Sequence, residues 1–280
     1  MLYIQKKNKL IVNINQNKNL NIEKRNKIIS DLINYLNSKK TKTSLNNKQY
    51  QLNYKKIFKI MIDPGHGGED PGAIGKNNTY EKNIVLQVSQ RLQSIIQKKS
   101  YIKVYMTRNK DIFVSLKHRI LEARRKKIDL FISIHTNSVK NKLAQGASVF
   151  ILSKKSAINV AEKHLLNTKY SIKKFIGIPS SGDYYLDNTM FDLLQNSTMY
   201  ESFKFGNKIL NSLGKITKLH KNTLNYAGFA VLKYPEIPSI LIELAFISNL
   251  QEEMKLNNPY YQQKIAEAIF HGIQLYLFNK

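Results

Sequence analysis

The chain of 280 residues contains no cysteine, and this absence excludes disulfide bonds and thiolate chemistry. A metal site in this protein must therefore be built from histidine, aspartate and glutamate side chains. Histidine is also scarce, with six residues in the whole chain, so the position of each one is informative. Cysteine-free proteins occur on both sides of a membrane, so the absence of cysteine does not identify a compartment.

Acidic residues and arginine are scarce as well. The 19 Asp and Glu residues face 45 Lys and Arg residues, which gives a formal net charge of +26, and only six of the basic residues are arginine. Nucleic-acid readers favour arginine and stacking aromatic side chains. Neither is clustered here, so we expect no nucleic-acid partner. The lysine excess fits either a compositional bias towards Lys, Asn and Ile or attraction to an anionic polymer such as cell wall.

Long apolar runs are missing too. No segment is long enough to predict a transmembrane helix. The basic N-terminal stretch has only a short apolar run, Leu10–Val12, which is too short for the apolar core of a signal peptide. We expect residues 1–53 to form a short basic arm rich in Lys and Asn, and residues 54–280 to form a single domain.

Within this domain, short apolar segments alternate with amphipathic segments that have helical spacing. The alternation predicts an α/β fold, with a mainly parallel twisted sheet flanked by helices. We expect strands at 57–63, 101–106, 129–135, 146–153 and 237–246, and helices at 81–97, 115–127 and 260–278.

Four polar residues stand at the ends of these elements. His66 follows the first strand between two glycines, in DPGHGGEDPGAIG, and His135 ends a buried strand, in SIHTNS. Glu243 interrupts an apolar strand, and Glu81 begins a helix. Polar side chains at strand ends of α/β sheets converge, because the carboxyl ends of the strands meet at one edge. Taken singly, each also has a structural explanation, such as a turn histidine or a carboxylate at a helix N-terminus.

Together these residues fit hydrolytic zinc chemistry. Two histidines and one glutamate, with water in the fourth position, form a common catalytic zinc site. Zinc lowers the pKa of that water to about 7, and a second carboxylate must then move the proton. Glu243 suits this second role, because an apolar strand raises the pKa of a carboxyl group.

Six motifs occur in this order over about residues 57–280: DPGHGGEDPGAIG, TYEKNIVL, DLFISIHTNS, QGASVFILS, AGFAVLKYPEIPSILIELAFISN and YQQKIAEAI. Together they resemble the motifs of the zinc-dependent N-acetylmuramoyl-L-alanine amidases. The resemblance implies that His66, Glu81 and His135 bind zinc and that Glu243 is the catalytic residue. It also implies that the substrate is peptidoglycan, cut at the amide between N-acetylmuramic acid and L-alanine.

Further residues are given expected roles, some from their position and one, His220, from the resemblance. Asn137, two residues after His135, is expected to orient substrate, and His220 matches a family position near the substrate cleft. Asp63 ends the first strand just before the loop and is interpreted as a residue that shapes this loop. The glycines on either side of His66 are expected to leave room for zinc and substrate.

A later segment, SSGDYYLDNTMFDLLQNSTMYES, resembles the amidases that split daughter cells in Gram-negative bacteria. This similarity implies a periplasmic enzyme with a regulatory insertion at about 153–196, whose helix blocks the zinc site until a LytM-type activator protein displaces it. Here Glu162 is the only carboxylate from Ser153 to Gly182, where relatives carry an acidic run. We expect a helix over Ala157–Lys169 with Glu162 as the blocking ligand, and a weakened block.

Three alternatives remain at this stage. The domain could bind peptidoglycan without catalysis, although a pure binder needs no general base. The net charge alone would also suit a nucleic-acid-binding protein. Finally, the same zinc chemistry could act on a different amide, such as a peptide bond.

Overall fold

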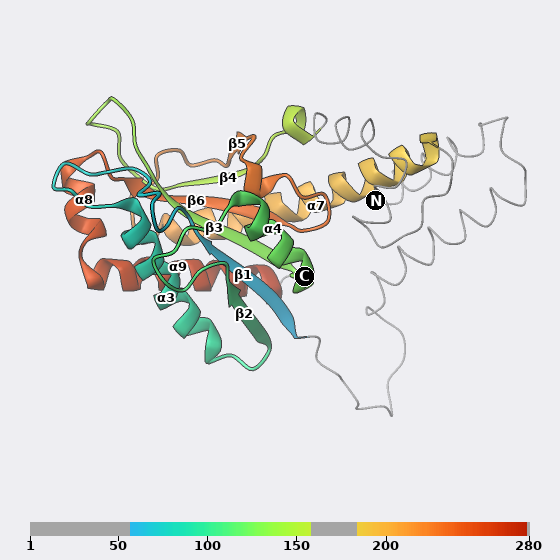
Figure 1. Cartoon of the computed structure of the whole chain (residues 1–280), viewed down its shortest axis with the longest axis horizontal. Coiled ribbons are helices and arrows are strands. Elements are labelled where there is room, and N and C mark those ends of the chain that lie inside the picture. Colours follow the sequence, from blue (N-terminus) through green and yellow to red (C-terminus); the bar gives the residue numbers. More distant parts are fainter. Residues whose placement is uncertain (1–56, 158–183, 279–280) are drawn as a thin grey trace, which may run out of the picture. The chain divides into compact units, whose positions relative to one another are not determined.

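A six-stranded sheet forms the centre of the described part of the chain (Figure 1). The computed structural model describes residues 57–157 and 184–278, within a unit that runs from Lys55 to Lys280. The predicted arm at 1–53 and Glu162 with most of its expected helix lie outside the described residues. Those predictions, and the domain division that depends on them, are therefore untested.

The strands follow the order β2-β1-β3-β6-β4-β5. All neighbouring pairs are parallel except β4 and β6, which are antiparallel. The predicted α/β fold with a mainly parallel sheet is thus confirmed. The strands are β1 (Phe58–Pro64), β2 (Ile102–Met106), β3 (Leu130–Asn137), β4 (Ser148–Leu152), β5 (Asn225–Ala227) and β6 (Ser239–Phe246).

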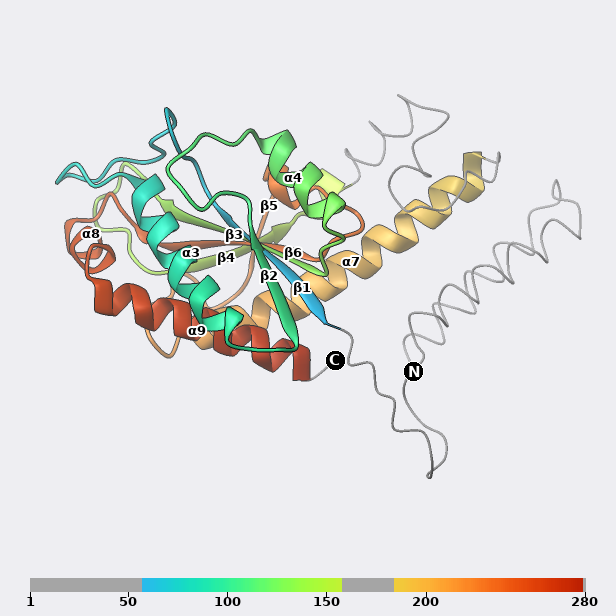
Figure 2. The same cartoon turned by 60° about the horizontal axis from the view of Figure 1, so that its bottom comes forward.

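Helices cover both faces of the sheet (Figure 2). The larger apolar core lies between the sheet and helices α3, α7 and α9, and the smaller core lies on the opposite face under α4 and η1. In the described residues, no helix is long and apolar enough to cross a membrane. The helices are α3 (Glu81–Gln97), α4 (Leu116–Arg125), α7 (Tyr184–Leu213), η1 (Ala230–Leu232), α8 (Leu250–Leu256) and α9 (Pro259–Phe278).

Strand alternation decides which side chains can form a site. In β3, Ile132 and Ile134 belong to the larger core, so His135 points to the other face of the sheet. His135 is paired in register with Glu243 of the parallel neighbour β6. Residues paired in this way share a face, so the sheet itself places these two predicted site residues beside each other.

A buried ion pair lies directly beneath the end of β1. Asp63 Oδ1 is 2.7 Å from Arg119 Nη1, and both side chains are almost inaccessible to solvent. The hydroxyl groups of Thr107 and Ser133 also donate to the Asp63 carboxylate, at 2.6 and 2.8 Å. Asp63 therefore anchors α4 to the strand end, which agrees with its expected part in shaping the loop.

Replacing Asp63 by asparagine is expected to lower the free energy of unfolding by about 3 kcal/mol, because it leaves the buried Arg119 guanidinium without its counter-charge. Glu122→Gln is the matched control, since its ion pair with Arg125 lies on the surface and such pairs contribute little. Urea unfolding of both variants checks this. Equal midpoints for the two variants would show that the Asp63–Arg119 pair does not support the fold.

Candidate metal centre

His66 extends from the turn that follows β1. Its backbone is left-handed, with φ of 58°, a conformation that is uncommon for residues other than glycine. Its Nδ1 lies 2.8 Å from Asp70 Oδ2, and its Nε2 lies 3.3 Å from Glu81 Oε1. An Nδ1–H donated to Asp70 leaves the lone pair of Nε2 free, as a metal-binding histidine requires.

Glu81 is the first residue of α3 and is only 2 % exposed. Two backbone groups hold its carboxylate: the Ala73 N–H donates to Oε2 at 2.8 Å, and the Thr136 N–H donates to Oε1 at 2.9 Å. The positive end of the helix adds to this stabilisation. The carboxylate is therefore fixed between the His66 loop and the end of β3.

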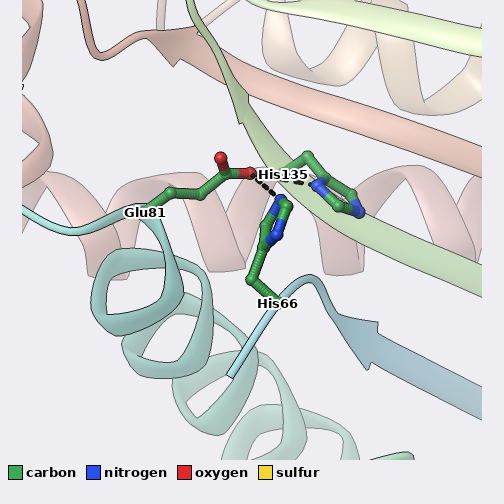
Figure 3. Close-up of side chains that lie close together, drawn as sticks. All are labelled: His66, Glu81 and His135. Carbon is green, nitrogen blue, oxygen red and sulfur yellow. Dashed lines mark hydrogen bonds and ion pairs between the residues drawn. The ribbon is translucent and has the colours of Figure 1, made fainter. Parts of the chain in front are cut away.

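His135 completes a three-residue group (Figure 3). Its Nδ1 lies 3.0 Å from Glu81 Oε1, and its ring meets that of His66 edge to face, with centroids 5.0 Å apart. One ligand atom from each of His66, Glu81 and His135 lies within 4.8 Å of the others. The three residues named as zinc ligands from sequence are thus brought together from a loop, a helix start and a strand end.

The electrostatics of the group favour a cation between these side chains. The hydrogen bond to Glu81 raises the pKa of His66 to about 9, against the opposing effect of burial. Burial tends to raise the pKa of Glu81, but its hydrogen bonds to His135 and His66 outweigh this and lower the pKa well below its usual range. A buried anionic carboxylate is therefore balanced by imidazolium character, and a divalent metal could replace that proton.

Glu243 faces this group from β6 but is held differently. Its Oε2 is buried and has no hydrogen-bond partner among the described residues. Burial raises its pKa to about 7, and the charges of His135 and Glu81 act in opposite directions on it. An unpartnered, poorly solvated carboxyl beside two imidazoles suits a group that exchanges a proton.

The donor set fits zinc. Two imidazole nitrogens and one carboxylate oxygen are a common catalytic zinc set, which leaves a position open for water or substrate. The buried Glu243 oxygen without a partner lies on the same sheet face as His135, where it could receive a proton from that position. Asp70 and the two backbone donors to Glu81 supply the outer contacts that orient such ligands.

Gly65 is needed for a reason that differs from the expectation. A Cβ at position 65 would lie 2.2 Å from Cε1 of His135, so the glycine makes room for the histidine ring itself. Similarly, a Cβ at Gly67 would lie 2.3 Å from the Ile112 carbonyl oxygen. These two glycines thus allow protein segments to pack closely around His66.

Gly65→Ala is expected to displace His135 and weaken zinc binding by at least tenfold, a loss typical of disturbed ligand orientation. The fold should survive, because the clash is with a side chain at the edge of the sheet. Titration with zinc against a chromogenic chelator measures the effect. Gly228→Ala is the control, because among the described residues its Cβ would meet only Ser156. Equal zinc affinity in both variants would contradict the role given to Gly65.

The two expected substrate residues lie at the same edge of the sheet. Asn137 ends β3 and pairs with Phe246 of β6. His220 is exposed, its ring packs against Phe246 with centroids 4.9 Å apart, and its Nδ1 lies 3.2 Å from the Gln145 carbonyl oxygen. Their substrate roles remain predictions.

Asp70 was missed as a functional residue in the sequence, although it lies in the same motif as His66. The signal was its spacing of four residues in a glycine-rich turn, which brings the two side chains together. The Gly67 and Asp70 backbones bond to each other in both directions, at 2.9 and 3.2 Å, and close this turn. The turn thus places the Asp70 carboxylate next to Nδ1 of the His66 ring.

Comparison with known proteins extends this description. The family described as N-acetylmuramoyl-L-alanine amidase matches residues 60–275. The amidase AmiC of Escherichia coli O6:H1 is 52% identical over 217 residues, covering 78% of this chain and 52% of that protein. The amidase AmiA of Salmonella typhimurium is 40% identical, covering 78% of this chain and 75% of that protein. The chain therefore spans about half the length of AmiC.

A solved structure shows the same fold. The N-acetylmuramoyl-L-alanine amidase from Clostridium difficile 630 superposes with a TM-score of 0.60 at 26% sequence identity, covering 80% of this chain and 99% of that one.

Proposed function

The chain belongs to the N-acetylmuramoyl-L-alanine amidase family, and from this membership we propose that it hydrolyses the amide between N-acetylmuramic acid and L-alanine in peptidoglycan, using zinc. The observation that carries the proposal is the group of His66, Glu81 and His135, with Glu243 paired in register beside His135. A binder without catalysis would not need a half-buried carboxyl with a raised pKa at this place.

In this proposal His66, Glu81 and His135 would hold the metal, and Glu243 would move the proton. Bound zinc acts as a Lewis acid that polarises a carbonyl and makes water acidic near neutral pH. Glu243 accepts a proton from the attacking water as its oxygen bonds to the lactyl carbonyl carbon. Glu243 then donates that proton to the alanine nitrogen as the carbon–nitrogen bond breaks. The products are a lactyl carboxylate and a peptide with a free amino terminus.

The pH dependence follows from Glu243. A general base must be deprotonated, so kcat/KM should fall as the pH decreases through the pKa of Glu243. Burial raises this pKa from 4.5 to about 7, and the charge of a bound metal would lower it again. We therefore expect an acidic limb between these two values. A constant kcat/KM from pH 4 to 8, measured with peptidoglycan as the substrate, would contradict this assignment.

The cellular role is a finer part of the proposal. Similarity to AmiC and AmiA, together with the insertion expected at about 153–196, supports a periplasmic enzyme that splits the septum during cell separation. A LytM-type protein would activate it, and a weakened block by Glu162 would give it a high basal rate. Deleting residues 156–172 and comparing basal rates tests the block, because a large increase would mean that the block is intact.

The first experiment is digestion of purified peptidoglycan with and without a zinc chelator. New amino-terminal alanine should appear, disappear with the chelator, and return when zinc is added back. New termini of another residue would favour a zinc hydrolase acting on a peptide bond. Wall binding without new termini would favour a binding module. Retention on DNA with a steep salt dependence would indicate a nucleic-acid-binding protein.

A further inference from the structure

Two buried arginines lie behind the metal centre and are outside the proposed chemistry. Arg108 is 2 % exposed and Arg119 is 3 % exposed. Both direct their guanidinium groups at the turn that carries His66. The proposed reaction uses neither side chain, although burying a cation is energetically costly unless the cation is paired and hydrogen-bonded.

Arg108 connects the two segments that carry His66 and Glu81. Its Nη2 donates to the carbonyl oxygen of Gly65 at 2.7 Å and to that of Lys82 at 2.9 Å. These are the residue just before His66 and the residue just after Glu81. A single nitrogen atom therefore bridges the backbones next to two proposed ligands.

The remaining donors of Arg108 fix its own orientation. Its Nε donates to the Pro64 carbonyl at 3.1 Å, and its Nη1 donates to the Lys110 carbonyl at 3.1 Å. A Cβ at Gly67 would lie 2.9 Å from Nε, so this glycine also makes room for Arg108. All four acceptors are backbone carbonyl oxygens. Because the guanidinium is planar and rigid, it holds these chain segments at a fixed separation.

Arg119 holds the same turn from the other side. Its Nη2 donates to the carbonyl oxygen of His66 itself at 2.8 Å, and its Nη1 donates to the Pro64 carbonyl at 2.6 Å. Its Nε donates to the Val114 carbonyl oxygen at 2.8 Å, and the Asp63 carboxylate balances its charge. Together the two arginines donate hydrogen bonds to three successive carbonyl oxygens, those of Pro64, Gly65 and His66.

The turn needs such donors. At Pro64 β1 ends, and the backbone turns through the left-handed conformation of His66; buried carbonyl groups in such a turn require hydrogen-bond partners. Any change in how they are satisfied would rotate the peptide units on both sides of the His66 Cα atom. Rotation there moves the imidazole relative to Glu81, whose Oε1 is 3.3 Å from Nε2.

We propose that Arg108 and Arg119 are positioning residues of the metal centre, which set the separation of His66 and Glu81 through the backbone carbonyls on either side of them. The inference rests on the proposed metal site but adds a requirement for guanidinium geometry at both positions. A lysine would keep the charge but place all its donors on one atom, so it could not hold the same set of carbonyls.

The test compares Arg108→Lys with wild type in the full chain. Zinc affinity is measured by competition with a chromogenic chelator, and cobalt is substituted to record the visible absorption bands that report coordination geometry. We expect 10- to 100-fold weaker zinc binding, the usual effect of an outer contact, and altered cobalt bands. Arg91→Lys is the control, because Arg91 bonds to Gln262 of α9 from the middle of α3.

The outcomes separate the possibilities. Wild-type protein that binds no zinc would reject the proposed function rather than this inference. Unchanged zinc affinity and cobalt bands in a folded Arg108→Lys variant would overturn the inference, even if its melting temperature fell. Arg119→Lys is the second variant, with the same expectation. If neither variant folds at low temperature, the arginines serve folding and the inference is also overturned.

Discussion

Replacing His135 by alanine is expected to abolish bound zinc and peptidoglycan hydrolysis together. The imidazole supplies one of three proposed ligand atoms and lies 3.0 Å from Glu81 Oε1. Its loss would leave only two of the proposed ligands, too few for a catalytic zinc site. Metal analysis after gel filtration should show a zinc content near zero, against about one zinc ion per chain in the wild type.

The control for this variant is His118→Ala. His118 is an exposed histidine of α4, on a different element from the proposed ligands. It should retain full zinc content and full rate. A His135→Ala protein with normal zinc content would show that the ligand set is wrong, whatever its activity.

The second large effect is expected for Glu243→Gln. Turnover should fall by about 100- to 10,000-fold, the range typical of a lost general acid–base group. Zinc content should not change, because Glu243 lies beside the three-residue group rather than in it. The neutral amide should also leave the melting temperature unchanged or higher, since burial disfavours the charged form of Glu243.

This combination of results is specific to a proton-transfer role. A variant that loses both zinc and activity would make Glu243 a ligand or a structural residue. A variant with a near-normal rate would exclude it as the general base. Steady-state rates on soluble peptidoglycan fragments measure the turnover, and zinc analysis of the same samples measures the metal content.

Much of the fold could be predicted from local patterns. The helix expected at 81–97 has those bounds in the structure, because its apolar spacing is regular and Glu81 marks its start. The strand predicted to end at His135 continues to Asn137, after a register shift between the two. Such an irregularity arises from pairing with β6 and has no local sequence signal.

The antiparallel pairing of β4 with β6 was also beyond local prediction. It depends on where the chain returns to the sheet after α7, a helix of 30 residues that begins within the segment expected to be an insertion. Apolar spacing indicates a strand, but strand order and direction depend on contacts between distant segments.

The residues of the candidate site also differ in whether local sequence patterns could predict them. His66, His135, Glu81 and Glu243 were found because their types and positions at element ends suit zinc chemistry. Asp70, Arg108 and Arg119 act on backbone or ring atoms that only the folded turn brings near. Gly65, one of the two glycines beside His66, was expected to leave room for zinc and substrate. In the structure it makes room for the His135 ring instead.

The most direct test of the central claim is mass spectrometry of peptidoglycan fragments after digestion by the zinc-loaded protein in water enriched in oxygen-18. Hydrolysis of the proposed amide predicts sugar fragments whose lactyl carboxylate carries one heavy oxygen, together with unlabelled stem peptides that begin with alanine. Heavy oxygen inside the stem peptide, or fragments cut between sugars, would contradict the proposed activity.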